Sequence, residues 1–176
     1  MICVLVVVAK NTKSAMGNKS AENLRIEVKD TGRYGLGLFA AKNIKKGEII
    51  ADSSGGKVYE AEKCSDLPKN VADYAIQFEE HKWIDVEEIG RYLNHSCEAN
   101  CGVKDRFKFV AMRDINRSEE LTFDYEMTED SDWSMKCNCG LSFCRKIIGA
   151  HKNMPLDIRK KYSGYISEWL VKKYKG

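Results

Sequence analysis

The sequence has no apolar run long enough to cross a membrane. Its most hydrophobic stretch, residues 2–9, holds eight residues, whereas a transmembrane helix needs about 20. No basic flank precedes this stretch and no small-residue cleavage site follows it, so it is not typical of a secretory signal. We interpret it as a buried strand followed by a polar connector to residue 22, and we expect an intracellular protein without membrane contact.

The sequence also lacks a strong net charge. Its 29 basic and 26 acidic side chains leave a formal charge of +3, which is too small to indicate direct nucleic-acid binding. The acidic residues are nevertheless clustered, because seven of them and no Lys or Arg lie between residues 119 and 132. This run is either a solvated loop beside a strand or a surface that attracts a basic peptide.

Internal repeats and long periodic helices are missing as well, apart from one C-terminal segment. With 176 residues, 43% hydrophobic and 31% charged, we expect one domain with its own core. Short alternating patterns predict strands over residues 24–28, 49–51, 74–78, 82–86, 107–111 and 121–125. Residues 155–174 carry an apolar stripe after Pro155, which predicts a single helix. The fold class is therefore mostly β with short helices.

A dinucleotide fingerprint is absent. Gly35, Leu36 and Gly37 form a GxG pattern, but the third glycine and the long following helix are missing, which excludes a Rossmann-type site. A hairpin turn explains the pattern equally well.

The seven cysteines need an explanation in a reducing compartment, where disulfides are rare. Cys137, Cys139 and Cys144 form a compact group, and neighbours in a CxC pair rarely reach disulfide geometry. A tetrahedral Zn²⁺ takes four such ligands, so a fourth must come from elsewhere. Cys97 and Cys101 are both candidates, and their spacing does not choose between them. We interpret Cys3 and Cys64 as buried small hydrophobic residues.

Residues 91–100, RYLNHSCEAN, concentrate polar chemistry in one short segment. His95 and Cys97 raise the possibility of a Cys–His nucleophile. Residues two apart in an extended chain face opposite sides, however, so this pair would need an unusual turn. We therefore reject the nucleophile.

Four motifs together resemble the SET domain of protein-lysine methyltransferases with its zinc-binding post-SET segment. They are RYGLGLFAAKNIKKGEII at residues 33–50, RYLNHSCEANC at 91–101, ELTFDY at 120–125 and CNCGLSFCRK at 137–146. The resemblance covers residues 24–149. It implies several small sheets, a pseudoknot in which ELTFDY threads beneath NHSC, a zinc knuckle and a C-terminal helix. The expected organisation is an N-terminal strand and connector (1–22), a SET domain (23–133), a post-SET segment (134–150) and a helix (151–176).

The resemblance also implies a set of site residues. S-adenosylmethionine would be held by Tyr34, Gly35, Leu36, Gly37, Arg91, Tyr92, Asn94, His95 and Phe143. Zn²⁺ would be held by Cys97, Cys137, Cys139 and Cys144, leaving Cys101 as a packed thiol. Tyr125 would be the catalytic tyrosine, with Phe123 lining a lysine channel on the same strand face.

The implied reaction is methyl transfer from a sulfonium to the ε-amine of a lysine in a basic protein such as a histone tail. A narrow apolar channel and the adjacent sulfonium both favour the neutral amine, so alignment by Tyr125 is the main requirement. Phe123 stands where the family's phenylalanine permits more than one methyl. A histone substrate implies the nucleus or chromatin of a eukaryotic cell or host, and otherwise the cytoplasm.

Three positions depart from the family pattern. Ser53 stands at a usual tyrosine position, so that either Tyr74 or Tyr92 compensates or the channel is wider. Ala99 replaces a proline, and Arg117-Ser118 replace a turn glycine. Ser53 motivates an alternative, a catalytically weak SET module that binds a peptide or partner. A third reading, a zinc protein that binds nucleic acid through its basic C-terminal helix, is disfavoured by the small net charge.

Overall fold

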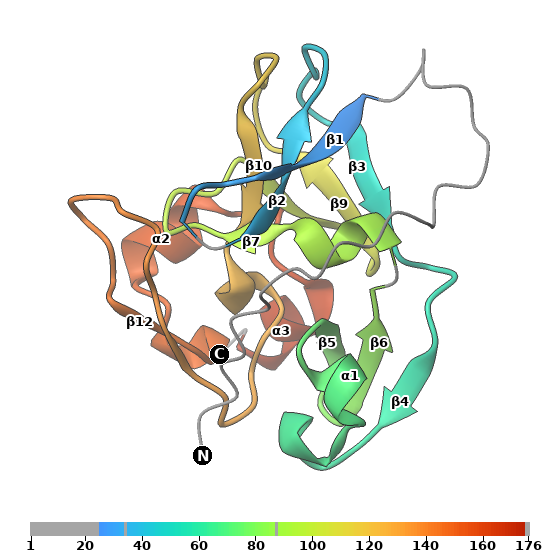
Figure 1. The fold of residues 1–176 in the computed structure, drawn as a ribbon. Helices are drawn as coiled ribbons and strands as arrows, with labels where there is room; N and C mark the ends of the chain where they lie inside the picture. Colours follow the sequence, from blue (N-terminus) through green and yellow to red (C-terminus); the bar gives the residue numbers. More distant parts are fainter. Residues whose placement is uncertain (1–24, 34, 87, 175–176) are drawn as a thin grey trace.

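A central sheet and two smaller sheets make up the computed structural model, which describes residues 25–33, 35–86 and 88–174 (Figure 1). The predicted strand at residues 2–9 and its connector lie outside this part of the chain. The seven-stranded sheet comprises β1 (Ile26–Asp30), β2 (Leu36–Ala40), β3 (Ile49–Asp52), β7 (Asn94–His95), β8 (Cys101–Lys104), β9 (Lys108–Ala111) and β10 (Glu120–Phe123). The smaller sheets comprise β4 (Val58–Glu60), β5 (Ala75–Glu79) and β6 (Lys82–Asp85), and β11 (Met135–Lys136) with β12 (Ile147–Ile148).

In the part of the chain that the structure describes, the helices are all short, as expected for this fold class. The α-helices there are α1 (Lys69–Ala72), α2 (Leu156–Lys161) and α3 (Glu168–Lys173), and the 3₁₀ turns are η2 (Cys64–Asp66), η3 (Glu88–Tyr92), η4 (Tyr125–Met127) and η5 (His151–Asn153). Within the described residues, no helix is long and apolar enough to span a membrane.

Strand β10 lies in the interior of the main sheet although it is the last of that sheet's strands in the sequence. It pairs antiparallel with β2, where Leu121 opposes Leu38, and parallel with β7 and β8, where Phe123 opposes His95 and Cys101. A late strand is therefore inserted between earlier ones, as the predicted pseudoknot requires. The chain enters it through a tight turn in which Ser118 has a φ of +70°, a strained value where the family has glycine.

The core forms where the inward faces of β2, β8, β9 and β10 meet. Leu38, Cys101, Ala111 and Leu121 are each 0% exposed. Tyr162 closes the core from the C-terminal side, where its hydroxyl accepts the Ala99 amide at 3.1 Å and donates to the Cys97 carbonyl at 3.3 Å. The core thus reaches the NHSC segment directly.

The prediction of one C-terminal helix is wrong. The segment forms α2 and α3, and between them Gly164 has a φ of +81°, which cannot continue a right-handed helix. The Val103 amide donates to the Tyr165 carbonyl at 2.8 Å, so β8 holds the connection in place. Lys173 then ties α3 to the β5 hairpin through Glu80 at 2.7 Å.

Figure 1 shows how these parts surround the end of β10. The main sheet lies in the upper half of the view, the three-stranded sheet with α1 at the lower right, and β12 at the lower left. The hairpin of β5 and β6 agrees with the predicted strands at 74–78 and 82–86. Strand β10 leads into η4 between these two lower parts.

Candidate active site

Tyr125 follows β10 directly and is held by the NHSC segment. Its hydroxyl donates to the Leu93 carbonyl at 3.1 Å, and its amide donates to His95 Nδ1 at 3.3 Å. Its ring lies 4.8 Å from that of Phe123, which agrees with the predicted shared face. Burial raises the pKa of the Tyr125 phenol, so the hydroxyl stays protonated at neutral pH and is a hydrogen-bonding group rather than a base.

His95 links Tyr125 to a cysteine. Burial lowers the pKa of His95 to about 3, so its ring is neutral. Because Nδ1 accepts the Tyr125 amide, the proton lies on Nε2, 3.5 Å from Cys97 Sγ. The prediction that His95 and Cys97 diverge is wrong, because the chain turns at Cys97 and Glu98 immediately after β7. The pair is nevertheless part of a larger thiol group rather than an isolated nucleophile.

Asn94 lies beside the glycine-rich turn. Its Nδ2 donates to the Leu36 carbonyl at 3.2 Å and to Glu120 Oε1 at 3.1 Å. A Cβ on Gly37 would lie 2.8 Å from that Nδ2 and 2.9 Å from that Oε1, so a larger residue there would displace the Asn94 and Glu120 side chains. Gly35 has a φ of +85°. The structure therefore brings residues 35–37 and Asn94 together, as a cofactor cradle built from both motifs requires, while Tyr34 lies outside the described residues.

The other predicted cofactor residues are placed differently. Arg91 Nη2 donates to both oxygens of Asp85, at 2.8 and 3.0 Å, and its guanidinium lies 4.7 Å from the centre of the Tyr74 ring. Tyr92 packs against the main core. Phe143 is 56% exposed and lies in the cysteine-rich part of the chain.

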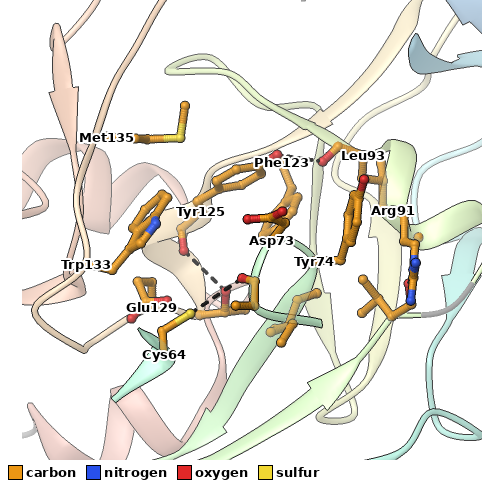
Figure 2. Close-up of a pocket in the computed structure, with 16 residues that line it drawn as sticks. Cys64, Asp73, Tyr74, Arg91, Leu93, Phe123, Tyr125, Glu129, Trp133 and Met135 are labelled. Carbon is orange, nitrogen blue, oxygen red and sulfur yellow. Dashed lines mark hydrogen bonds between the residues drawn. The ribbon is translucent and has the colours of Figure 1, made fainter. Parts of the chain in front are cut away.

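An aromatic cleft opens beside Tyr125 (Figure 2). It has a volume of about 240 Å³, enough for one extended aliphatic side chain. Tyr125 and Trp133 lie on one side of it and Tyr74 and Arg91 on the other, with Asp73 between them (Figure 2). The remaining lining includes Phe123, Glu129, Leu93 and Met135. A basic aliphatic chain would meet carboxylates and aromatic faces along the same cleft.

Ser53 does not line this cleft. It is 8% exposed and borders a separate void of about 10 Å³ with Phe107 and Phe109. Tyr74 does line the aromatic cleft, so a phenol is present there without one at position 53. Ser53 is therefore weaker support for the alternative of a catalytically weak SET module.

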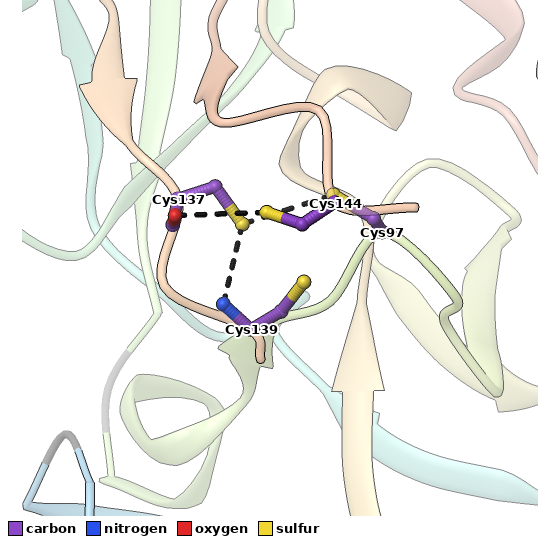
Figure 3. Close-up of side chains that lie close together, drawn as sticks. All are labelled: Cys97, Cys137, Cys139 and Cys144. Atoms are coloured by element: carbon purple, nitrogen blue, oxygen red, sulfur yellow. Dashed lines mark hydrogen bonds between the residues drawn. The ribbon is translucent and has the colours of Figure 1, made fainter. Parts of the chain in front are cut away.

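Four cysteines form a compact thiol group (Figure 3). The Sγ atoms of Cys97, Cys137, Cys139 and Cys144 all lie within 4.8 Å of one another, and those of Cys97 and Cys137 are 3.7 Å apart. Zinc–sulfur bonds of about 2.3 Å in a tetrahedron separate sulfurs by about 3.8 Å, so the group fits Zn²⁺. Cys101 lies apart in the core, and burial raises its pKa to about 12. The choice that spacing left open therefore falls on Cys97.

Comparison with known proteins follows this geometry. Residues 35–126 match the family model described as the SET domain. The chain belongs to the SET-domain family.

Its relatives are much longer proteins. The SET-domain chain is 35% identical over 132 residues to histone-lysine N-methyltransferase 2B of Homo sapiens, covering 65% of this chain and 5% of the relative. It is 33% identical over 134 residues to the H3 lysine-4 specific histone-lysine N-methyltransferase of Aspergillus oryzae, covering 65% of this chain and 11% of the relative. The chain thus spans a small part of the length of the curated relatives it matches.

A solved structure has the same fold. The crystal structure of KRYPTONITE in complex with mCHG DNA and SAH superimposes with a TM-score of 0.53 at 25% identity, covering 69% of this chain and 28% of that one. The resemblance seen in the motifs is therefore confirmed in both sequence and fold.

Sequence reasoning missed Arg145, which organises this SET domain around two buried acids. Asp124 and Glu126 are 0% and 2% exposed, so neither the solvated-loop nor the peptide-surface interpretation of the acidic run is correct for them. Glu129 is also buried, at 9%. Burial raises the pKa of Glu126 to about 7, and the Arg145 guanidinium opposes that rise. The signal in the sequence was the acidic run at residues 119–132, which contains no basic residue to pair with it. The first arginine after that run is Arg145, in the CRK motif.

Proposed function

We propose that this SET domain transfers a methyl group from S-adenosylmethionine to the ε-amine of a lysine in a basic protein, with histones as the first candidates. The main observation in support of this proposal is the buried phenol of Tyr125, which lies where the chain leaves β10, bound to the NHSC segment and beside the aromatic cleft. The names of the relatives, histone-lysine methyltransferases, support the substrate class. The SAH in the solved neighbour supports the methyl donor, because SAH is what S-adenosylmethionine leaves after transfer.

The methyl donor fits the turn at residues 35–37 together with Asn94 and His95. The hydrogen bond from Asn94 to the Leu36 carbonyl supports this placement, because it holds the two motifs together. Tyr34, Arg91, Tyr92 and Phe143 complete the proposed set. When bound, the donor supplies an electrophilic methyl group on a sulfonium.

The residues of the cleft would then orient the lysine. The Tyr125 hydroxyl donates its hydrogen bond to the Leu93 carbonyl, so its oxygen is free to accept a hydrogen bond from an N–H of the neutral amine. This bond would turn the nitrogen lone pair away from the ring. Glu129 and Asp73 would attract the charged side chain as it enters, and the rings of Tyr74, Phe123 and Trp133 would favour loss of its proton. Phe123 leads us to propose that more than one methyl is added.

We also propose that the thiol group holds zinc. The donor set is four buried cysteines at tetrahedral spacing, the usual composition of a structural zinc site. Zinc would fix residues 133–149, which we call the cysteine segment, against the NHSC segment. Trp133 and Met135 of the cysteine segment line the cleft, so the metal would complete one wall of it. By analogy with its relatives, we place the protein on chromatin.

Mass spectrometry after incubation with labelled S-adenosylmethionine, core histones and a cell lysate tests this proposal. It reports activity, substrate and methyl number in one measurement. Transfer to lysine is expected. Binding of the methyl donor without transfer to any lysine would instead favour the peptide-binding module.

Tyr125→Phe is the sharpest variant. We expect the rate of transfer to fall by about 100-fold because the amine loses its orienting oxygen, while the affinity for S-adenosylmethionine is unchanged. Tyr165→Phe is the matched control, since that ring lies between α2 and α3 beneath Lys104 and outside the cleft. Survival of activity in Tyr125→Phe would show that the phenol has another role.

A further inference from the structure

Arg145 grips both neighbours of Tyr125. Its Nη2 donates to Asp124 Oδ2 at 2.6 Å and its Nη1 to Glu126 Oε2 at 2.5 Å. The side chains of the two acids are 0% and 3% exposed and that of Arg145 is 14% exposed. One cation therefore fixes the residue on each side of the phenol in a site almost closed to water.

The same arginine is attached to the thiol group. It follows Cys144 in the chain, and its amide donates to Cys97 Sγ at 3.4 Å. The second oxygen of Glu126, Oε1, accepts the Gly149 amide at 3.0 Å. The cysteine segment and the Tyr125 turn are thus joined through one guanidinium and one carboxylate, over sequence separations of 19 to 23 residues.

Stability alone does not account for this arrangement. Replacing a buried ion pair by apolar residues of similar volume is often neutral or stabilising, so buried charges are weak stabilisers. What the ion pairs add is direction, because a planar fork that binds two carboxylates permits few geometries. Asp124 and Glu126 are the chain neighbours of Tyr125 on either side, so holding both through one guanidinium limits how the ring between them can turn.

We propose that Arg145 is a positioning residue that couples the four-cysteine site to Tyr125. With the cysteine segment docked, Arg145 holds Asp124 and Glu126, and the phenol keeps its place against Leu93 and beside the cleft. When the segment is released, the two acids lose their shared cation and the turn that carries Tyr125 loosens. This inference rests on the proposed methyl transfer and adds the residue through which the thiol site acts on it.

The test uses the full chain loaded with zinc and compares Arg145→Met and Arg145→Lys with Arg113→Met. Arg113 is an exposed arginine that pairs with Glu119 at 2.8 Å, so its variant controls for the loss of an ordinary ion pair. Three quantities are measured: kcat and KM for the methyl donor, the rate of zinc release to a chelator, and hydrogen exchange over residues 120–128.

For Arg145→Met we expect kcat to fall about 100-fold while KM for the methyl donor stays within about twofold, the signature of lost alignment. Zinc release is expected to be about tenfold faster, as for other residues that support a metal ligand, and exchange over residues 120–128 to increase. Arg145→Lys should recover part of kcat, because a single ammonium reaches one carboxylate but not both. Arg113→Met should behave as the unchanged protein.

A triple variant separates positioning from charge burial. Asp124→Asn, Glu126→Gln and Arg145→Met together remove all three charges and should restore folding if Arg145→Met alone is unstable. We expect kcat to stay low in the triple variant. Recovery of kcat with stability would overturn the proposal, as would unchanged zinc release and exchange in Arg145→Met. Both of those readouts are independent of methyl transfer, so an inactive parent protein would remove the proposed function without deciding this coupling.

Discussion

The main sheet and the cysteine segment are held together by different forces. In the sheet, Leu38, Cys101 and Leu121 are fully buried and successive strands pair along ladders of up to five residues. The cysteine segment has one ladder of two residue pairs, a thiol group and the ion pairs of Arg145. Apolar burial stabilises the sheet whatever the state of the thiols, whereas the cysteine segment would depend on the proposed zinc and on the charges of the Arg145 ion pairs. The cleft lies where the end of the main sheet and the cysteine segment meet the region of α1 and β5.

The largest expected effect comes from exchanging a thiol in each region. Cys97→Ser should weaken zinc binding by more than about 100-fold, because a thiolate ligand is lost, and should abolish methyl transfer. Cys101→Ser, four residues along the same segment, should keep the zinc and lower the free energy of unfolding by about 1–3 kcal/mol, because it buries a hydroxyl in the core. Metal analysis and urea denaturation measure the two effects. Zinc lost from Cys101→Ser and kept by Cys97→Ser would reverse the assignment of the fourth ligand.

Truncation of a side chain in the core of the sheet should lower the stability of the protein but not its binding of zinc. Leu121→Ala leaves a cavity in the centre of the sheet and should lower the free energy of unfolding by about 2–5 kcal/mol. Zinc should stay bound for as long as the protein is folded. Leu156→Ala, at a side chain 70% exposed, is the matched control and should change the free energy by less than about 0.5 kcal/mol. Early loss of zinc from Leu121→Ala would show that the two regions unfold together.

Much of the sheet could be predicted from the sequence because its strands alternate locally. Residues 121–125 and 107–111 carry the period of a half-buried strand and overlap β10 and β9, although three successive residues are buried in each of these strands, so both of their faces are covered. The prediction of a single C-terminal helix is wrong because a local apolar pattern does not record contacts with distant parts of the chain. Its apolar stripe suits one helix, but Gly164 has a positive φ and Tyr165 is bound to β8 through the Val103 amide, a contact that no local pattern records.

The candidate site divides in a similar way. Asn94, His95 and Tyr125 lie in contiguous motifs, so the sequence could name them. Arg145 could not be assigned, because its partners Asp124 and Glu126 are 21 and 19 residues away and each looks like an ordinary exposed charge by itself. The contact of His95 with Cys97 was missed because it depends on a turn rather than on strand periodicity.

The smallest expected effect concerns an apolar ring that the cysteine segment leaves exposed. Phe143 is 56% exposed, which contrasts with the buried side chains of the sheet. Phe143→Ala should change the free energy of unfolding by less than about 0.5 kcal/mol. If the ring covers the methyl donor, as its resemblance to the post-SET segment implies, the Kd for S-adenosylhomocysteine should rise about fivefold, the loss expected for one aromatic contact.

Ile147→Ala is the matched control for Phe143→Ala, because Ile147 is 68% exposed on the same segment. Calorimetric titration of the parent protein and both variants measures the Kd. An equal Kd in all three would remove Phe143 from the cofactor residues and leave the cysteine segment with a role only at the cleft, through Trp133 and Met135. A rise confined to Phe143→Ala would mean that the cysteine segment contributes to both the methyl-donor site and the lysine cleft, which the sheet alone cannot supply.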